Sequence, residues 1–313
     1  MIGVIGGTGQ VGRHVVRALV AHGEMVACVS RTPCESDSDK VIWRRIESYS
    51  REEVSTALAG CSGAIATLGL PYNGDVWLRE WAPLVGDVTQ GCLAAGIPLT
   101  FLDNLYATGR AQMPITEQSP IAPCSKKGQA RADGLTVLDA ARKDGLDLVV
   151  CRSSDFVGPG VEVTILPWKP IESIVNGSST KLTWIGDPSA RHTFSWVPEI
   201  SSCLASICVD TSLRGHDLVN LPVLAPVSGH ELAQILSDIT GHKVKVSAMR
   251  DPMVAIASPF MASAREQHEM MYEVDQDFLV SDDLIRSMGW VPDRLTIKDC
   301  IRTSLEKHGH IEG

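Results

Sequence analysis

Short apolar runs alternate with amphipathic segments through the first half of the chain. Six runs have the length and composition of buried strands, and four of the segments between them carry apolar residues at helical spacing. The predicted strands are 1–5, 24–30, 41–46, 64–68, 98–102 and 146–151, and the predicted helices are 14–20, 51–58, 77–95 and 129–143. This alternation predicts an α/β fold with a parallel sheet covered on both faces, whose ligands lie at the carboxyl ends of the strands.

The pattern changes at about residue 160. A segment rich in proline and apolar residues is followed by predicted strands at 182–185 and 244–248 and by predicted helices at 201–209, 229–240 and 297–307. With 313 residues, 44% of them hydrophobic, the chain is long enough to bury a large core. We therefore expect one large or two modest domains.

A glycine-rich turn ends the first predicted strand and leads directly into a helix. Glycine lets the backbone bend sharply and lets main-chain N–H groups approach a phosphate, and the helix N-terminus adds partial positive charge. This order of strand, turn and helix predicts a site for the pyrophosphate of a dinucleotide, with a plain turn as the alternative. The residues assigned to the cofactor here are Gly6, Thr8, Gly9, Gln10, Val11 and Gly12.

The end of the second predicted strand indicates which dinucleotide is bound. A carboxylate at this position would accept hydrogen bonds from the adenosine ribose, whereas a cation would pair with a 2′-phosphate. The sequence has Ser30 and Arg31 here, and the next acidic residue, Glu35, lies beyond Pro33. NADP(H) is therefore predicted rather than NAD(H), unless Arg31 is only a solvated loop cation.

Net charge and composition indicate which classes of binding partner and which cellular location to expect. The net charge of -9 and the lack of a Lys/Arg cluster disfavour nucleic acid as a partner. No apolar run approaches the ~20 residues of a membrane span, so we expect a cytoplasmic protein without a membrane segment. The nine cysteines are scattered and are interpreted as reduced and structural. No metal site is predicted, because His308 and His310 lie in a polar C-terminal tail.

Several stretches together carry a resemblance to a known family. The turn 6–12 resembles that of the extended and atypical short-chain dehydrogenase/reductases, the superfamily that includes NAD-dependent epimerase/dehydratases. Later segments that are similar to the family's are 103–109, 152–160, 191–199 and 284–292. The resemblance implies a Rossmann-type doubly wound parallel sheet with a smaller C-terminal substrate lobe. It implies an NADP(H)-binding domain at 1–158 and a mainly substrate-binding lobe at 159–313, from which about 193–222 returns to the first domain. It also implies a possible homodimer.

The family's usual catalytic pair is not found in the matching segment. Ordinary members use a tyrosine as general acid and base, with a lysine four residues later. By spacing, Ser125 falls at the tyrosine position, Gln129 at the lysine position and Asn104 at the family's Ser/Thr position. Ordinary alcohol dehydrogenation is therefore in doubt.

Other residues are candidates for proton chemistry. Lys127 is one candidate proton donor, because it begins the helix before the sixth strand and a largely apolar pocket would favour its neutral form. Resemblance to reductases that rely on a lysine without the tyrosine supports it. Tyr106, which follows the fifth strand, is the other, and Asn104 is a candidate for polarising a carbonyl. Each of these residues also has a purely structural interpretation.

The remaining candidates line the expected cofactor and substrate sides. Leu68 and Phe156, at the ends of their strands, are assigned to the cofactor. Tyr72, Trp77 and Asp155 are assigned to the substrate, although helix packing would explain the aromatic residues equally well. Arg191 and His192 are interpreted as structural, because a histidine that begins a strand is usually satisfied by hydrogen bonds.

These observations lead to three functional hypotheses. The first is an NADP(H)-dependent oxidoreductase that acts on a carbonyl or conjugated double bond of a small, largely apolar molecule. The second is an isomerase, dehydratase or cyclase on the same scaffold. The third is a catalytically silent NADP(H) sensor, for which the missing tyrosine and lysine are expected.

Overall fold

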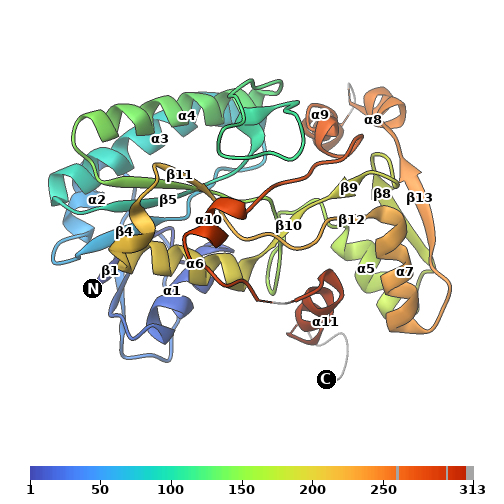
Figure 1. Cartoon of the computed structure of the whole chain (residues 1–313), viewed down its shortest axis with the longest axis horizontal. Helices are drawn as coiled ribbons and strands as arrows, with labels where there is room; N and C mark the ends of the chain where they lie inside the picture. Colours follow the sequence, from blue (N-terminus) through green and yellow to red (C-terminus); the bar gives the residue numbers. More distant parts are fainter. Residues whose placement is uncertain (259–260, 294, 308–313) are drawn as a thin grey trace.

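The computed structural model describes residues 1–258, 261–293 and 295–307. Its main feature is a seven-stranded, wholly parallel sheet in the order β11-β6-β5-β4-β1-β2-β3, which confirms the predicted Rossmann-type α/β fold (Figure 1). The strands are β1 (Ile2–Ile5), β2 (Val26–Ser30), β3 (Val41–Arg45), β4 (Gly63–Ala66), β5 (Leu99–Asp103), β6 (Leu148–Arg152) and β11 (Leu218–Asn220). All the predicted strands of the first half are present, within one or two residues of their predicted ends.

Helices cover both faces of this sheet, as the alternation predicts. Figure 1 shows α3 and α4 on one face and α1 and α6 on the other. The helices are α1 (Gly12–Ala21), α2 (Arg51–Ala57), α3 (Gly74–Ala95), α4 (Lys126–Lys143) and α6 (Val197–Val209). The crossovers place the carboxyl ends of β1, β4, β5 and β6 at one edge, where a ligand site is expected.

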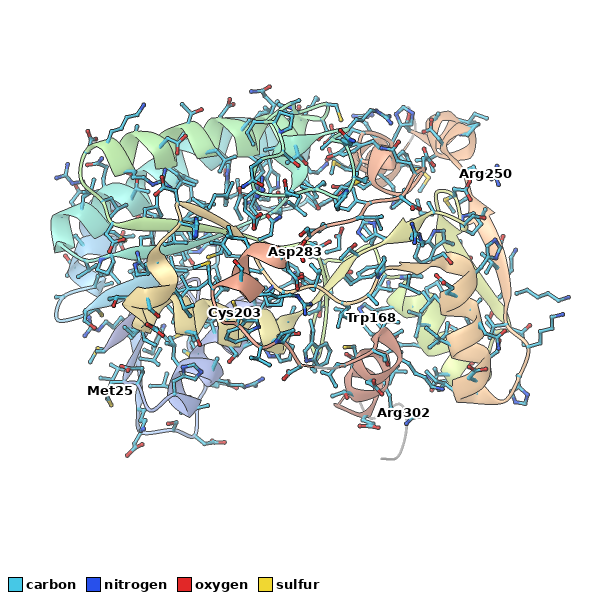
Figure 2. All side chains as sticks on the ribbon, viewed as in Figure 1. Met25, Trp168, Cys203, Arg250, Asp283 and Arg302 are labelled. Atoms are coloured by element: carbon cyan, nitrogen blue, oxygen red, sulfur yellow. The ribbon has the colours of Figure 1, made fainter. Side chains whose placement is uncertain are left out.

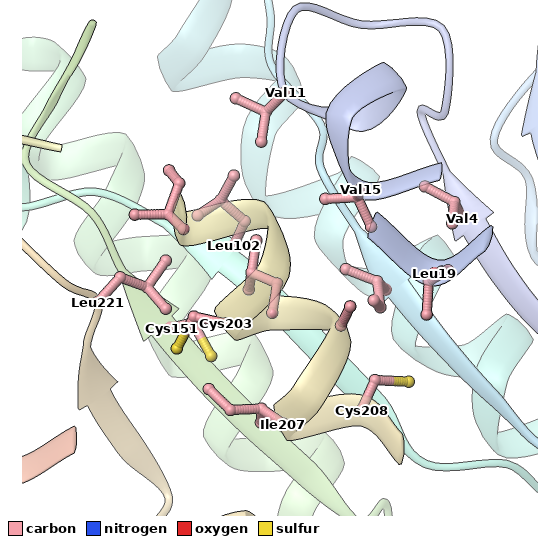
Figure 3. Close-up of a cluster of buried hydrophobic side chains, with 14 of the residues drawn as sticks. Val4, Val11, Val15, Leu19, Leu102, Cys151, Cys203, Ile207, Cys208 and Leu221 are labelled. Carbon is pink, nitrogen blue, oxygen red and sulfur yellow. The ribbon is translucent and has the colours of Figure 1, made fainter. Parts of the chain in front are cut away.

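Two apolar layers hold the helices to the sheet. On one face, Val15 and Leu19 of α1 and Cys203 and Ile207 of α6 belong to one cluster of buried side chains, in which Cys203 lies beside Cys151 of β6 (Figure 3). In the all-side-chain view, Cys203 lies inside this layer (Figure 2). On the other face, Trp81 of α3 packs among aliphatic side chains of α2 and α4. Burial of these side chains contributes roughly 1.5–3 kcal/mol each and fixes the sheet beneath the site.

Local capping explains why two helices begin earlier than their apolar periodicity predicts. Helix α3 begins at Gly74 because Oδ1 of Asn73 accepts hydrogen bonds from the N–H groups of Asp75 and Val76. Helix α4 begins at Lys126 because Oγ of Ser125 accepts the N–H of Gly128. Each cap satisfies N–H groups that the first helical turn leaves without partners.

The C-terminal region forms a smaller unit beside the large sheet. Strands β8 (Lys181–Ile185) and β13 (Lys245–Met249) pair in parallel, and the region has its own buried core that includes Trp184, Leu232 and Ile301. Its helices are α5 (Trp168–Val175), α7 (Gly229–Thr240), α8 (Asp251–Ala257), α9 (Ala262–His268) and α11 (Ile297–Lys307). The smaller C-terminal region predicted from the sequence is confirmed.

The chain passes between the two units more than once. Strand β10 (Phe194–Trp196) pairs with β7 (Asp155–Val157) in a separate two-stranded sheet, and β9 (Arg191–His192) pairs with β12 (Val227–Ser228). Helix α6 and strand β11 then rejoin the large unit, and α10 (Asp283–Ser287) follows near β11. Strand β10 of the segment 191–199 thus pairs with β7 and not with the main sheet. The position beside β6 in the main sheet is occupied by β11.

Among the helices that the structure describes, none combines the length and the apolar character needed to cross a membrane.

Candidate functional site

A cavity of about 370 Å³ opens at the carboxyl edge of the main sheet. It lies between the ends of β1, β4, β5 and β6 and residues of the C-terminal region, including Glu273 and Phe278. The candidate residues that line it are Gly9, Gln10, Val11, Leu68, Tyr72, Trp77, Asn104, Tyr106, Lys127, Asp155 and Phe156. The fold therefore brings the candidate cofactor, catalytic and substrate residues into one space. The roles assigned to them stay predictions.

Four candidates do not line the cavity: Gly6, Thr8, Gly12 and Arg31. Gly6 has a φ of +80°, and a Cβ on Gly12 would lie 2.1 Å from the carbonyl oxygen of Gly6. Both glycines are thus required by the turn itself. Thr8 and Thr32 are joined by their hydroxyl oxygens, which lie 2.9 Å apart, so the turn contacts the loop after β2.

The glycine turn fits a bound phosphate. The N–H of Gly9 donates to Gly6 O, and this bond closes the turn at 2.9 Å. Val11, the residue before α1, provides no side-chain cap, and the first turn of α1 has no acidic residue. The positive end of the helix dipole is therefore directed at the cavity without a protein carboxylate to neutralise it, which suits a pyrophosphate.

Gln10 connects the turn to the loop that follows β7. Its Oε1 accepts the N–H groups of Glu162 and Val163, and its Nε2 donates to Val163 O. The loop is thereby held across the glycine turn, and Val163 itself lines the cavity. The side chain of Gln10 therefore shapes the entrance to the site.

Arg31 lies at the carboxyl end of β2 and is exposed. Its guanidinium carbon is 5.5 Å from the ring centroid of Tyr49. The neighbouring Ser30 is buried, and its hydroxyl donates to Thr32 O. The strand end therefore presents a cation to solvent and no carboxylate, an arrangement that suits the 2′-phosphate of NADP(H).

The expectation of a largely apolar environment for Lys127 is wrong. Its side chain is only 1% exposed, and Nζ donates to the carboxylates of Glu266 and Glu269, with 2.7 Å to Oε1 of Glu269. Nζ also lies 4.3 Å from the ring centroid of Tyr72. Because two carboxylates face its Nζ, Lys127 is held in place as an ion-paired residue.

Tyr106 and Asn104 lie on the turn after β5. The Oδ1 atom of Asn104 accepts the N–H of Tyr106, so its amide oxygen orders the turn. Burial raises the pKa of Tyr106 well above its usual value, and the charges of Glu273 and Asp155 raise it further. Tyr106 lines the cavity, and a phenol hydroxyl can donate a hydrogen bond to a ligand.

His192 and Asp155 form a buried pair at the cavity wall. The Nδ1 atom of His192 lies 3.2 Å from Glu273 O, and Nε2 lies 2.9 Å from Oδ2 of Asp155. Because a carbonyl oxygen only accepts, Nδ1 is the donor in the first contact, and Nε2 is the ring atom that contacts the carboxyl group. The ring of Phe278 stacks on the imidazole at 4.9 Å and 9°. His192, interpreted from the sequence as structural, thus also orients a residue of the cavity.

Glu273 is the residue of the site that sequence reasoning missed most clearly. Its side chain is 2% exposed and lines the cavity, and among the described residues Oε1 has no hydrogen-bond partner. Burial raises its pKa well above the usual value, and the charge of Asp155 adds to the effect. No local pattern marks it, because it lies on a single turn of 3₁₀-helix, Met271–Glu273, far along the chain from the strand ends.

The buried side chain of Arg131 packs beside the cavity between an aspartate and two tryptophans. Nη1 of Arg131 donates to Oδ1 of Asp103 at 2.6 Å, and the guanidinium carbon lies 4.4 Å and 4.1 Å from the rings of Trp77 and Trp81. All four side chains are buried. Trp77 also donates from Nε1 to Pro71 O. Trp77 therefore combines the two roles considered for it, since it packs the helix and faces the cavity.

The two residues at the family's tyrosine and lysine positions have local roles. Ser125 caps α4, and Gln129 donates from Nε2 to Oδ1 of Asp133 one turn along the same helix. Neither lines the cavity. Within the described part of the chain no group of three or more candidate ligands gathers into a metal site, and His308 and His310 lie outside the described residues.

No protein-family model and no curated protein sequence matches the chain. Solved structures do match over nearly its full length. A protein of Burkholderia cenocepacia J2315, provisionally assigned as an epimerase, has a TM-score of 0.79 at 15% identity, covering 97% of this chain and 96% of that one. The dTDP-glucose 4,6-dehydratase DesIV of Streptomyces venezuelae, with NAD bound, has a TM-score of 0.75 at 18% identity, covering 99% and 98%.

A third match is the UDP-Glc/GlcNAc 4-epimerase of Campylobacter jejuni, with a TM-score of 0.74 at 15% identity and 99% of both chains covered. At such low identity the likeness concerns the fold. The chain has the fold of these epimerases and this dehydratase, which confirms the resemblance found in the sequence at the level of the fold.

Proposed function

We propose, from this shared fold and the cavity at the glycine turn, that the protein is an NADP(H)-dependent oxidoreductase acting on a carbonyl or conjugated double bond of a small, largely apolar molecule. The observation that carries the proposal is the meeting of two features in one cavity. The uncapped N-terminus of α1 borders it on one side, and the phenol of Tyr106 borders it on the other. A dinucleotide and a proton donor would thereby face the same substrate.

The roles of the chain's own residues follow from this placement. The turn 6–12 would hold the pyrophosphate, and Arg31 would pair with the 2′-phosphate. When bound, the nicotinamide supplies hydride transfer. Tyr106 would donate the proton to the reduced substrate, because its side chain lines the cavity. Lys127, held by two carboxylates, would position Tyr72 and the substrate rather than donate the proton.

The test begins with titration of the purified protein with NADPH and with NADH, followed by tryptophan quenching. We expect NADPH to bind in the micromolar range and at least ~10-fold more tightly than NADH, a gap of about 1.4 kcal/mol. A panel of ketones, aldehydes and enones is then screened for loss of NADPH absorbance. On an active compound, Tyr106→Phe should lower turnover about 100-fold and leave NADPH affinity unchanged. Failure of both nucleotides to bind would reject the proposal.

A binding-only NADP(H) sensor is the second candidate. It is favoured by one observation: Ser125 caps α4 and Gln129 donates to Asp133 of the same helix, so no tyrosine and lysine pair stands at those positions. A sensor would bind NADPH in the titration and show no turnover with any compound of the panel.

A further inference from the structure

The cationic side chains of the cavity are already neutralised by the protein. Arg131 is paired with Asp103, and the ammonium of Lys127 contacts the carboxylates of both Glu266 and Glu269. Lys127 thus faces more negative charge than it carries. These cations provide no free positive charge for an anionic substrate.

Two further carboxyl groups line the cavity, and the protein supplies neither with a lysine or arginine partner at ion-pair distance among the described residues. Oδ2 of Asp155 lies 2.9 Å from Nε2 of His192, so this carboxyl group has a partner within the protein. Glu273 is 2% exposed, and its Oε1 has no hydrogen-bond partner within the described part of the chain. An unpaired carboxyl group buried in this way costs free energy unless a ligand provides the opposite charge or a proton.

The walls between these groups are aromatic. Tyr72, Trp77, Tyr106 and Phe278 line the cavity, and Tyr72 is 46% exposed at its mouth. Aromatic faces attract organic cations through their quadrupoles, and the attraction is strongest where water is excluded. The Lys127 ammonium over the ring of Tyr72, at 4.3 Å, shows that this ring already contacts a cation.

From the buried Oε1 of Glu273, which has no hydrogen-bond partner among the described residues, and from the aromatic walls, we infer that the cavity binds an organic cation, so that the substrate carries a protonated amine or another positively charged nitrogen on its apolar body. The positive nitrogen lies against Glu273, and the apolar body contacts the aromatic side chains. This inference rests on the proposed function only in treating the cavity as the substrate side of the nucleotide site.

The experiment compares three probes of similar size and different charge: benzylamine, benzyl alcohol and benzoate. Binding is measured by calorimetry at pH 7 with the full-length protein, with and without saturating NADPH. We expect protonated benzylamine to bind at least about tenfold more tightly than benzyl alcohol, and benzoate to bind most weakly. Glu273→Gln should weaken benzylamine about tenfold and leave benzyl alcohol unchanged. The matched control is Glu52→Gln, because Glu52 is an exposed residue of α2 that does not line the cavity.

Equal affinity for amine and alcohol, tighter binding of benzoate, or no measurable binding of benzylamine would overturn the inference. If Glu273→Gln does not fold, the comparison of benzylamine with benzyl alcohol on the unsubstituted protein tests the same prediction. Failure of the inference is separable from failure of the proposed function. If NADPH binds but the amine is not preferred, only the inference of a cation site is rejected. If the amine is preferred but NADPH does not bind, only the proposed oxidoreductase function is rejected.

Discussion

The Nζ atom of Lys127 lies 2.7 Å from Oε1 of Glu269, although 142 positions separate the two residues in the chain. Glu266, one helical turn earlier, contacts the same ammonium and accepts the N–H of Gly74 at the start of α3. Glu269 also accepts the N–H of Lys126 at the start of α4. Hydrogen bonds and ion pairs thus join the end of α9 to the N-termini of α3 and α4, beside the cavity.

Replacing Lys127 by methionine should destabilise the protein by about 2–3 kcal/mol, because two partly buried carboxylates would face each other without their cation. The adjacent Lys126→Met is the matched control. Lys126 is 51% exposed and pairs with an exposed Asp75, so solvent screens the pair and its loss should leave the stability nearly unchanged. Urea unfolding at pH 7 measures both free energies of unfolding. Similar values for the two variants would contradict this assignment of the ion pairs.

Replacing Arg31 by alanine should weaken NADPH binding by roughly 1–3 kcal/mol and leave NADH binding nearly unchanged, because only NADPH carries the 2′-phosphate. Fluorescence titration of the variant with each nucleotide measures the difference, and NADH serves as the internal control. If both nucleotides lose the same affinity, Arg31 does not contact the 2′-phosphate.

Gly12→Ala should lower NADPH affinity more than about tenfold, because a Cβ at this position would lie 2.1 Å from Gly6 O and would force the turn apart. Gly86→Ala, within α3, is the control. Its Cβ would meet nothing closer than Val137 at 3.8 Å, so the substitution should keep NADPH binding and stabilise the helix by roughly 0.5–1 kcal/mol. Unchanged NADPH affinity in Gly12→Ala would mean that the turn does not hold the nucleotide.

Glu199 should make stability depend on pH. Burial raises its pKa from 4.5 to about 7, and Oε1 accepts the N–H of Asp293. Since the unfolded chain loses this proton at lower pH than the folded protein, the residue destabilises the fold progressively from about pH 4.5 to pH 7.

Glu199→Gln keeps an acceptor oxygen and removes the ionisation. It should therefore add about 1–2 kcal/mol of stability at pH 8 and almost nothing at pH 4.5, measured by urea unfolding at each pH. An equal change at both values would show that the effect is packing rather than proton linkage.

The sequence by itself determined the sheet, its helices and the place of the ligand edge. Strands such as β1 and β6 are continuous apolar runs, and α7 was located at 229–240 without error, because these signals are periodic and local. The glycine turn could also be predicted from the sequence, since the backbone conformation that requires glycine depends on only a few neighbouring residues. The starts of α3 and α4 depended on the caps Asn73 and Ser125, which apolar periodicity does not register.

Only the tertiary structure decided the electrostatics of the cavity. Glu266, Glu269 and Glu273 carry no motif, yet they determine the charge around Lys127 and Tyr106. The pairing of His192 with Asp155 joins positions 37 residues apart on different short strands. Charge and burial at a site depend on which distant side chains the packing brings together, and a single sequence holds no local signal for such contacts. The fold was therefore predictable here, whereas the chemistry of the cavity was not.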